Sequence, residues 1–217
     1  FAGADAMREP GSTPLLGRRS PQGGENEGTA AIANLCRHPS TARFLATKLV
    51  RHFVSDRPHP LDIDIIAGVY LDTDGDLAEV SLALLDLDGA FYGPERKIRS
   101  PQEFLIAMGR GLGLSKVDRK AVSALTALRH IPWSPPSPAG YSDEVADWGD
   151  PDGLLRRADL ARMVTKRARA RLTDVGAFAQ DVIEVRDPAL LNALLAEQSS
   201  AADQATLVFA SPDFQWR

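Results

Sequence analysis

The chain has 217 residues, of which 44% are hydrophobic and 25% are charged. These proportions are typical of a globular protein, and the length suits one large domain or two small ones with a buried core. The formal net charge of −4 at pH 7 argues against a general binder of nucleic acid or anionic membranes, because such proteins depend on clustered Lys and Arg. No apolar run approaches the roughly 18 residues that a membrane-spanning helix needs, so we expect no nucleic-acid partner and no transmembrane segment.

The N-terminal stretch predicts little regular structure. Residues 1–28 are rich in Gly, Pro and charge without a sustained period, so we expect an irregular lead-in with one short extended piece around Leu15 and Leu16. The chain begins with Phe1 rather than Met, which we interpret as a processed or truncated piece that would have lost any export signal. The single cysteine, Cys36, cannot form an internal disulfide, and its apolar surroundings predict a small buried side chain.

Helical signals dominate from Thr29 onward. A helix over 29–37 is ended by Pro39, and the next helix is expected over 40–55. Apolar side chains recur there at steps of three and four, the spacing of one helix face: Ala42, Leu45, Ala46, Leu49, Val50 and Phe53.

Three further segments are interpreted as helical. Residues 61–65 alternate like a strand, but the apolar spacing continues to Tyr70 at helical steps, and a lone strand would have no partner. Residues 76–91 and 202–214 each predict a helix followed by an acidic turn and a phenylalanine.

Capping chemistry marks several helix ends. Residues 100–103, Ser-Pro-Gln-Glu, offer a side-chain cap, a proline at the first helical position and a glutamate that can complete a capping box. Gly111 and Gly113 end that helix, and another is expected over 115–129. Residues 150–152, Asp-Pro-Asp, repeat the cap-then-proline pattern.

These elements together predict an all-α protein of about seven to nine short helices packed around one core. We expect an irregular lead-in over 1–28, a single helical domain over 29–217, and one loop rich in proline and aromatic residues.

That loop is the longest irregular stretch and is expected over 131–147. Four prolines prevent a regular helix there: Pro132, Pro135, Pro136 and Pro138. Long irregular loops in compact domains are often functional. The rings of Trp133, Tyr141 and Trp148 could form a binding surface for a polymer or a sugar, or they could pin the loop onto the helical core.

The segment Asp72-Thr73-Asp74-Gly75-Asp76 resembles the start of an EF-hand calcium loop. Asp72, Asp74 and Asp76 occupy its first, third and fifth positions. Leu77 replaces the required glycine, and Ala83 replaces the closing bidentate glutamate. The sequence therefore predicts a polar turn with a helix cap and no metal site, and these three carboxylates are the weak alternative.

The four histidines are His38, His52, His59 and His130. None forms a metal-binding pair at i and i+4, and no second cysteine is present. His38 precedes Pro39 at a helix end, where an imidazolium could meet free carbonyls. His52 is expected to be partly exposed beside Lys48. A catalytic site assembled from distant residues could still use His38 or His52.

Other catalytic and cofactor motifs are missing from the sequence. There is no Gly-x-Ser-x-Gly nucleophile elbow. The glycines over 109–113 follow a helix rather than a strand, so they predict a helix end and not a dinucleotide loop, and we expect no cofactor. A basic series predicts a solvated helix face: Arg156, Arg157, Arg162, Lys166, Arg167, Arg169 and Arg171.

Several motifs carry a resemblance to a known family. They are Glu9-Pro10-Gly11, Gly23-Gly24-Glu25, His38-Pro39, Thr73-Asp74-Gly75-Asp76, Ser100-Pro101, Pro135-Pro136 with Gly140-Tyr141, and Ser211-Pro212-Asp213-Phe214. Through them the chain resembles the bacterial family catalogued as domain of unknown function 1800. The resemblance spans nearly the whole chain, which would correspond to the C-terminal half of that family's usual length. It implies an exported bacterial protein, periplasmic or secreted, and it implies no reaction.

Two functions follow as hypotheses. In the first, the protein is a non-catalytic exported protein that binds a partner protein or a cell-envelope polymer through the aromatic loop. In the second, it is an enzyme whose site lies between this chain and a missing N-terminal half, with His38, His52 or the acidic turn contributing. We also expect residues 1–28 to pack on that missing half, and an exposed apolar surface where it docks. The oligomeric state is not predicted.

Overall fold

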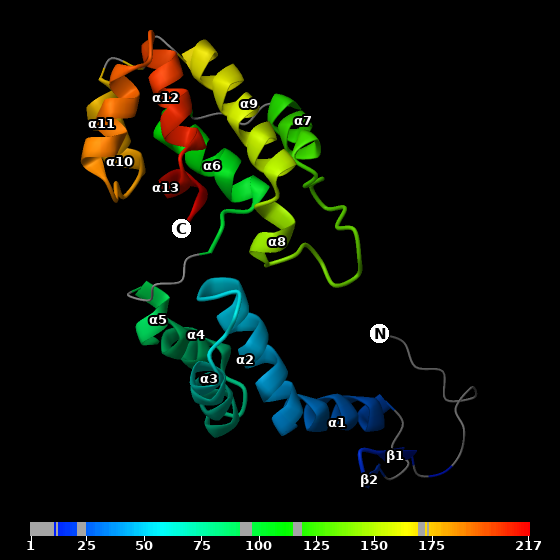
Figure 1. Ribbon diagram of the computed structural model, residues 1–217. Coiled ribbons are helices and arrows are strands. Elements are labelled where there is room, and N and C mark those ends of the chain that lie inside the picture. The colour runs from blue at the N-terminus through cyan, green and yellow to red at the C-terminus, as the bar shows by residue number, and fades with distance from the viewer. Residues whose placement is uncertain are drawn as a thin grey trace. The chain divides into compact units, whose positions relative to one another are not determined.

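The computed structural model describes residues 11, 13–20, 25–91, 97–114, 119–168, 172 and 174–217. Thirteen helices and one two-stranded sheet lie in this part of the chain (Figure 1), so the all-α class is confirmed. The helix count is above the expected seven to nine, because two predicted helices are each divided in two and others were not foreseen.

The chain divides into two compact units, 1–95 and 96–217, each with its own buried hydrophobic cluster where one core was expected.

The first unit contains a β-hairpin and five helices among its described residues. Their bounds are β1 (Thr13–Leu15), β2 (Arg18–Ser20), α1 (Glu25–Cys36), α2 (Pro39–Phe53), α3 (Pro60–Asp72), α4 (Leu77–Leu85) and α5 (Asp88–Phe91). The strands are antiparallel, with Leu15 opposite Arg18. Leu16 and Gly17 between them have φ angles of 47° and 76°, as two-residue hairpin turns require. The lead-in thus has more regular structure than expected, since it holds the hairpin and the start of α1.

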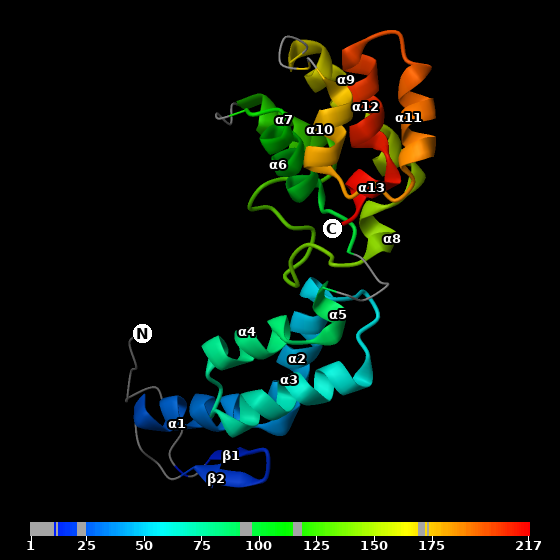
Figure 2. The same cartoon turned by 90° about the vertical axis from the view of Figure 1, so that its left-hand side faces the viewer.

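Helices α2, α3 and α4 form the core of the first unit (Figure 2). Ala42 and Ala46 of α2 are fully buried, and their small side chains let α3 pack closely. Ile66 and Tyr70 of α3 fill the interface, and the Tyr70 hydroxyl donates to the carbonyl oxygen of Cys36 at 2.9 Å. Cys36 itself is exposed, so its expected burial is wrong. It ends α1, from which the described residues contribute nothing to this buried cluster.

The second unit contains eight helices among its described residues. Their bounds are α6 (Pro101–Gly111), α7 (Arg119–Ala127), α8 (Val145–Trp148), α9 (Pro151–Ala168), α10 (Val175–Val182), α11 (Pro188–Ala196), α12 (Ala201–Ala210) and α13 (Pro212–Gln215). The capping box is confirmed, because Glu103 N donates to Ser100 Oγ and Ser100 N donates to Glu103 Oε2. The expected helix over 115–129 is α7, and residues 115–118 lie outside the described residues.

The core of the second unit is built around α6, α9, α10 and α12 (Figure 1). Phe214 packs edge to face against Phe104 and Phe209, with ring centroids 5.6 and 4.8 Å away, an arrangement that aromatic rings favour. Where α6 meets α10, a Cβ atom on Gly111 would lie 2.8 Å from a methyl carbon of Val182. Gly111 therefore ends the helix and also permits this close approach.

The last residues of the chain close the second unit onto its first residues. Ile98 and Trp216 form an antiparallel bridge, and Arg99 N donates to the carbonyl oxygen of Gln215 at 2.8 Å. The guanidinium of Arg99 also donates to the carbonyl oxygen of Phe214 and lies 4.8 Å from the centre of its ring. The segments that precede and follow the helices of this unit in the sequence are therefore paired with each other.

Arg157 of α9 holds this closure together. Its side chain is only 1% exposed. It donates from Nη2 to the carbonyl oxygen of Arg99 at 2.8 Å and from Nη1 to Gln215 Oε1 at 3.0 Å, and it lies 5.3 Å from the Phe104 ring centre. Desolvation lowers the pKa of Arg157 to about 10 although two nearby carboxylates oppose the shift, so the group stays cationic at neutral pH. The predicted solvated basic face is therefore wrong for Arg157.

Arg157→Ala should lower the free energy of unfolding by about 3–5 kcal/mol, because two buried acceptors lose their donor and a cavity remains. The matched control is Arg156→Ala on the same helix. Arg156 is exposed and pairs with Asp152 at 2.8 Å, so its loss should cost less than about 1 kcal/mol. Urea unfolding measures both values, and equal effects would contradict the role given to Arg157.

Candidate functional site

The aromatic loop, residues 131–144, joins α7 to α8. The irregular stretch was expected to reach residue 147, but the short helix α8 occupies its last part. The segment from Ile131 to Ala139 contains no charged residue, and every side chain from Trp133 to Ala139 is exposed. The loop thus presents a neutral surface of proline, serine and one indole ring.

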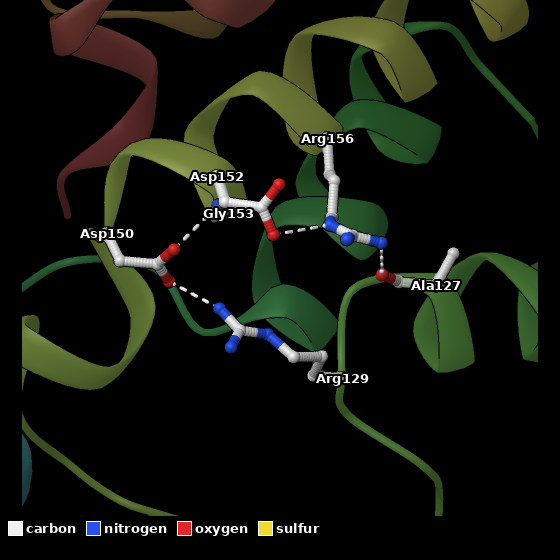
Figure 3. A network of polar contacts seen from close by, with 6 residues as sticks. All are labelled: Ala127, Arg129, Asp150, Asp152, Gly153 and Arg156. Atoms are coloured by element: carbon white, nitrogen blue, oxygen red, sulfur yellow. Dashed lines mark hydrogen bonds and ion pairs between the residues drawn. The ribbon is translucent and has the colours of Figure 1, made fainter.

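A polar network joins the chain just before this loop to the start of α9, beyond α8 (Figure 3). Arg129, just after α7, donates from Nη2 to Asp150 Oδ2 at 2.6 Å, and Gly153 N donates to Asp150 Oδ1 at 3.0 Å. Beside this pair, Arg156 bonds Asp152 and reaches the carbonyl oxygen of Ala127. The Gly153 amide and then Arg129 hold the pKa of Asp150 below its usual value. The clasp formed by Arg129 and Asp150 therefore stays ionised in mildly acidic solution.

Tyr141 and Trp148 fix the loop onto the second unit around His130. The rings of Tyr141 and His130 are stacked, with centroids 4.0 Å apart and planes 17° apart, and the Trp148 ring lies 5.6 Å from His130. The Tyr141 hydroxyl donates to the carbonyl oxygen of Ile131, and Trp148 Nε1 donates to the carbonyl oxygen of Ser142 at 2.7 Å. Both side chains thus serve as anchors of the loop.

Trp133 differs from the other two aromatic residues. Its side chain is 99% exposed, and its backbone has a φ angle of 61°, a left-handed conformation that bulky residues rarely adopt. The structure therefore brings Tyr141 and Trp148 together and leaves Trp133 apart from them. Sequence reasoning missed His130, which is 5% exposed, because a single histidine after a helix gives no sign of the rings that will cover it.

The structure assigns His38 to a helix cap. His38 Nδ1 accepts a hydrogen bond from Ser40 N at 3.1 Å at the start of α2. An imidazolium at a carbonyl end was expected, and this is wrong, because the free groups at this end are N–H donors. Since Nδ1 accepts, the ring proton lies on Nε2. His59 caps α3 in the same way, with Leu61 N as donor at 3.3 Å.

His38 also borders a hollow of about 460 Å³ in the first unit. Residues of the hairpin and of the junction between α1 and α2 line it: Leu15, Leu16, Asn34, Leu35, Arg37, His38 and Pro39. His52 is exposed at the other end of α2, with its ring edge to face with Phe53 at 4.6 Å. His52 follows His38 by 14 positions along α2, a rise of about 21 Å, so the two candidate histidines are not brought together.

Two carboxylates of the acidic turn, residues 72–76, form hydrogen bonds within the first unit. Asp74 accepts two hydrogen bonds from Arg37, at 2.6 and 2.7 Å, and this bonding lowers the pKa of Asp74. Asp76 caps α4 by accepting from Ala78 N at 2.8 Å, while Asp72 ends α3. Across the described ranges, no three His, Cys, Asp or Glu side chains form a group that could hold a metal ion.

The chain is a helical protein with an anchored aromatic loop, and it belongs to the family described as "Protein of unknown function (DUF1800)", which it matches over residues 1–216. The resemblance is thus confirmed over essentially the whole chain. The search of curated proteins found no match, and neither did the search of solved structures. Among the helices that the structure describes, none has the length and apolar composition needed to cross a bilayer.

Trp133→Ala should change the free energy of unfolding by less than about 0.5 kcal/mol, because the ring is 99% exposed. Trp133→Gly should be as stable or up to about 1 kcal/mol more stable, since glycine relieves the left-handed conformation. Tyr141→Ala should cost about 1–3 kcal/mol through the lost stack and hydrogen bonds. Urea unfolding compares the three variants, and a large loss in Trp133→Ala would show that this ring is a structural anchor.

His38→Ala should destabilise the first unit by about 1 kcal/mol through the lost cap, and His38→Asn should restore most of that loss, because asparagine is a good N-cap residue. Thermal unfolding followed by circular dichroism measures both. Equal losses in the two variants would show that His38 stabilises the protein in some way other than capping.

Proposed function

We propose that this protein is a non-catalytic binding protein of the bacterial cell envelope, and that its aromatic loop presents Trp133 to a neutral polysaccharide. The proposal includes export to the periplasm or the cell surface. It treats the second unit as a scaffold that holds the loop, and it needs no cofactor or metal.

The conformation and exposure of Trp133 carry the proposal. A left-handed backbone costs about 1–2 kcal/mol for a residue with a side chain, and Trp133 has a φ angle of 61°. The indole is also 99% exposed, so no buried contact with the described part of the chain offsets that cost. Strained residues of this kind are commonly kept for contact with a ligand.

The composition of the loop favours a neutral polysaccharide over a partner protein. A stable protein interface buries about 800 Å² on each side around a group of anchors, whereas this loop presents one large ring. Ser134 and Ser137, both exposed, offer hydroxyls for hydrogen bonds with sugar hydroxyls. The uncharged segment from Ile131 to Ala139 favours an uncharged polymer. Prolines also lower the entropy that the loop loses when it is ordered.

The enzyme hypothesis has one supporting observation, the hollow bordered by His38. Its chemistry is weaker, because the cap uses the lone pair of His38 Nδ1 and leaves Nε2 as a donor. A general base needs a free lone pair. The non-catalytic hypothesis is therefore the better supported of the two.

Binding to a panel of soluble neutral polysaccharides tests the proposal: a β-1,4-glucan, a β-1,3-glucan and an α-mannan, with an anionic polymer for comparison. At least one neutral polymer should bind the full chain, and Trp133→Ala should weaken that binding about tenfold or more, equivalent to about 1.4 kcal/mol. Phe91→Ala is the control, since Phe91 is an exposed aromatic residue outside the loop. Equal losses in both variants, or no binding to any neutral polymer, would overturn the proposal.

A further inference from the structure

His130 lies against the two aromatic rings that anchor the aromatic loop. Its ring is buried, and Nδ1 has no hydrogen-bond partner among the described residues. One face of the ring is stacked on Tyr141, and Trp148 lies beside it. Trp148 in turn bonds Ser142, and Tyr141 bonds Ile131. The aromatic rings that fix the loop thus converge on one titratable side chain.

The surroundings favour the neutral imidazole. Burial lowers the pKa of His130, while its own backbone carbonyl and then Glu103 act in the opposite direction. The Tyr141 ring face also favours a cation, by about 0.5–1 kcal/mol in exposed settings. The net shift in the pKa of His130 is downward, because the desolvation of the buried ring outweighs these contributions.

The charged groups on the elements around His130 are mostly engaged elsewhere. Glu103 completes the capping box of α6 and pairs with Arg217 at 3.2 Å, which reduces its effect on the ring. Lys97 Nζ donates to the carbonyl oxygen of Asp143. The charged groups on the neighbouring segments are Lys97, Glu103, Arg129, Asp143, Asp147, Asp150 and Arg157. Only Glu103 among them contributes to the titration of His130.

We propose that protonation of His130 releases the aromatic loop from the second unit, so that Trp133 is held in its binding position near neutral pH and is loosened in mild acid. This inference rests on the proposed function for the role of Trp133, and it adds regulation of that same site. The loop opens because an imidazolium is better solvated in water than beneath Tyr141.

The direction of the pH effect follows from linkage. The pKa of His130 is lower in the folded state than in the unfolded state, where it is near 6.5. The neutral ring therefore stabilises the anchored loop fully above that value, and this stabilisation is lost as the pH falls toward the folded pKa. One proton is taken up, so the equilibrium constant for opening rises by at most about tenfold per pH unit. The Arg129–Asp150 clasp stays ionised in this range and does not cause the change.

Hydrogen exchange detected by NMR tests the proposal on the full chain between pH 7.5 and 5.0, with correction for the intrinsic pH dependence of exchange. The reporters are Ser134 N–H and the Trp148 indole N–H, which both make loop hydrogen bonds. Their protection should fall by up to about tenfold per pH unit below about 6.5, while the buried Val208 amide stays protected. Protection that does not change with pH, or a parallel fall at Val208, would overturn the proposal.

Two variants identify the titrating group. His130→Phe keeps an apolar ring beside Tyr141 and should make loop protection independent of pH. His52→Gln removes an exposed histidine and should behave as the wild type does. Should His130→Phe fail to fold, the ring resonances of His130 in the wild-type protein decide. Their titration must coincide with loop opening, and proton uptake without opening would contradict the proposal.

Polysaccharide binding at pH 7.5 and 5.5 separates this inference from the proposed function. Binding that weakens together with loop protection supports both. Loop opening without polysaccharide binding at either pH would overturn the proposed function and the regulatory role, and would leave only the His130-linked opening itself. Binding that is equally tight at both pH values while the loop opens would overturn the regulation alone.

Discussion

The burial of Arg157 constrains the rest of the second unit. A guanidinium with 1% exposure is stable only where acceptors replace its water, and here the acceptors come from Arg99 and Gln215, 58 residues away in sequence on either side. The start and the end of the unit are therefore both fixed to α9. Because α9 begins at Pro151, its position also fixes Asp150, whose bond to Arg129 closes the base of the aromatic loop. The exposed indole of Trp133 thus depends on a buried charge on a different element.

Local chemistry in the sequence predicted several helix boundaries. The cap at Ser100, the glycine at the end of α6 and the Asp-Pro start of α9 each depend on neighbouring residues alone, and the structure has all three. Long-range contacts were not predictable in the same way. Arg156 and Arg157 are adjacent in a basic run, and only the contacts of Arg157 with the distant Arg99 and Gln215 distinguish the buried residue from the exposed one. The division into two clusters likewise depends on which helices pack together, which apolar periodicity does not specify.

The sequence predicted where the candidate site lies but not the different roles of its aromatic residues. Proline and aromatic composition located the loop, but the three rings were treated as one group. Their roles differ because His130 supplies a stacking partner for Tyr141 and lies near Trp148, while Trp133 has a left-handed backbone that turns it away from such contacts. Neither fact has a sequence signal, since left-handed residues other than glycine follow from tertiary context. The His38 cap had a local signal, the His-Pro pair that recurs at His59, and its orientation was misassigned.

The conformation of the aromatic loop depends on unfavourable contributions at Trp133 and on the contacts that oppose them. A left-handed backbone at Trp133 and an indole in water both favour rearrangement of the loop, and the clasp, the Tyr141 stack and the Trp148 hydrogen bond oppose it. The clasp and the stack respond to different conditions, because Asp150 remains ionised where His130 begins to take up a proton. Mild acid therefore removes one anchor and leaves the base of the loop closed. The expected consequence is local opening of the loop while α9 and the core of the second unit remain folded.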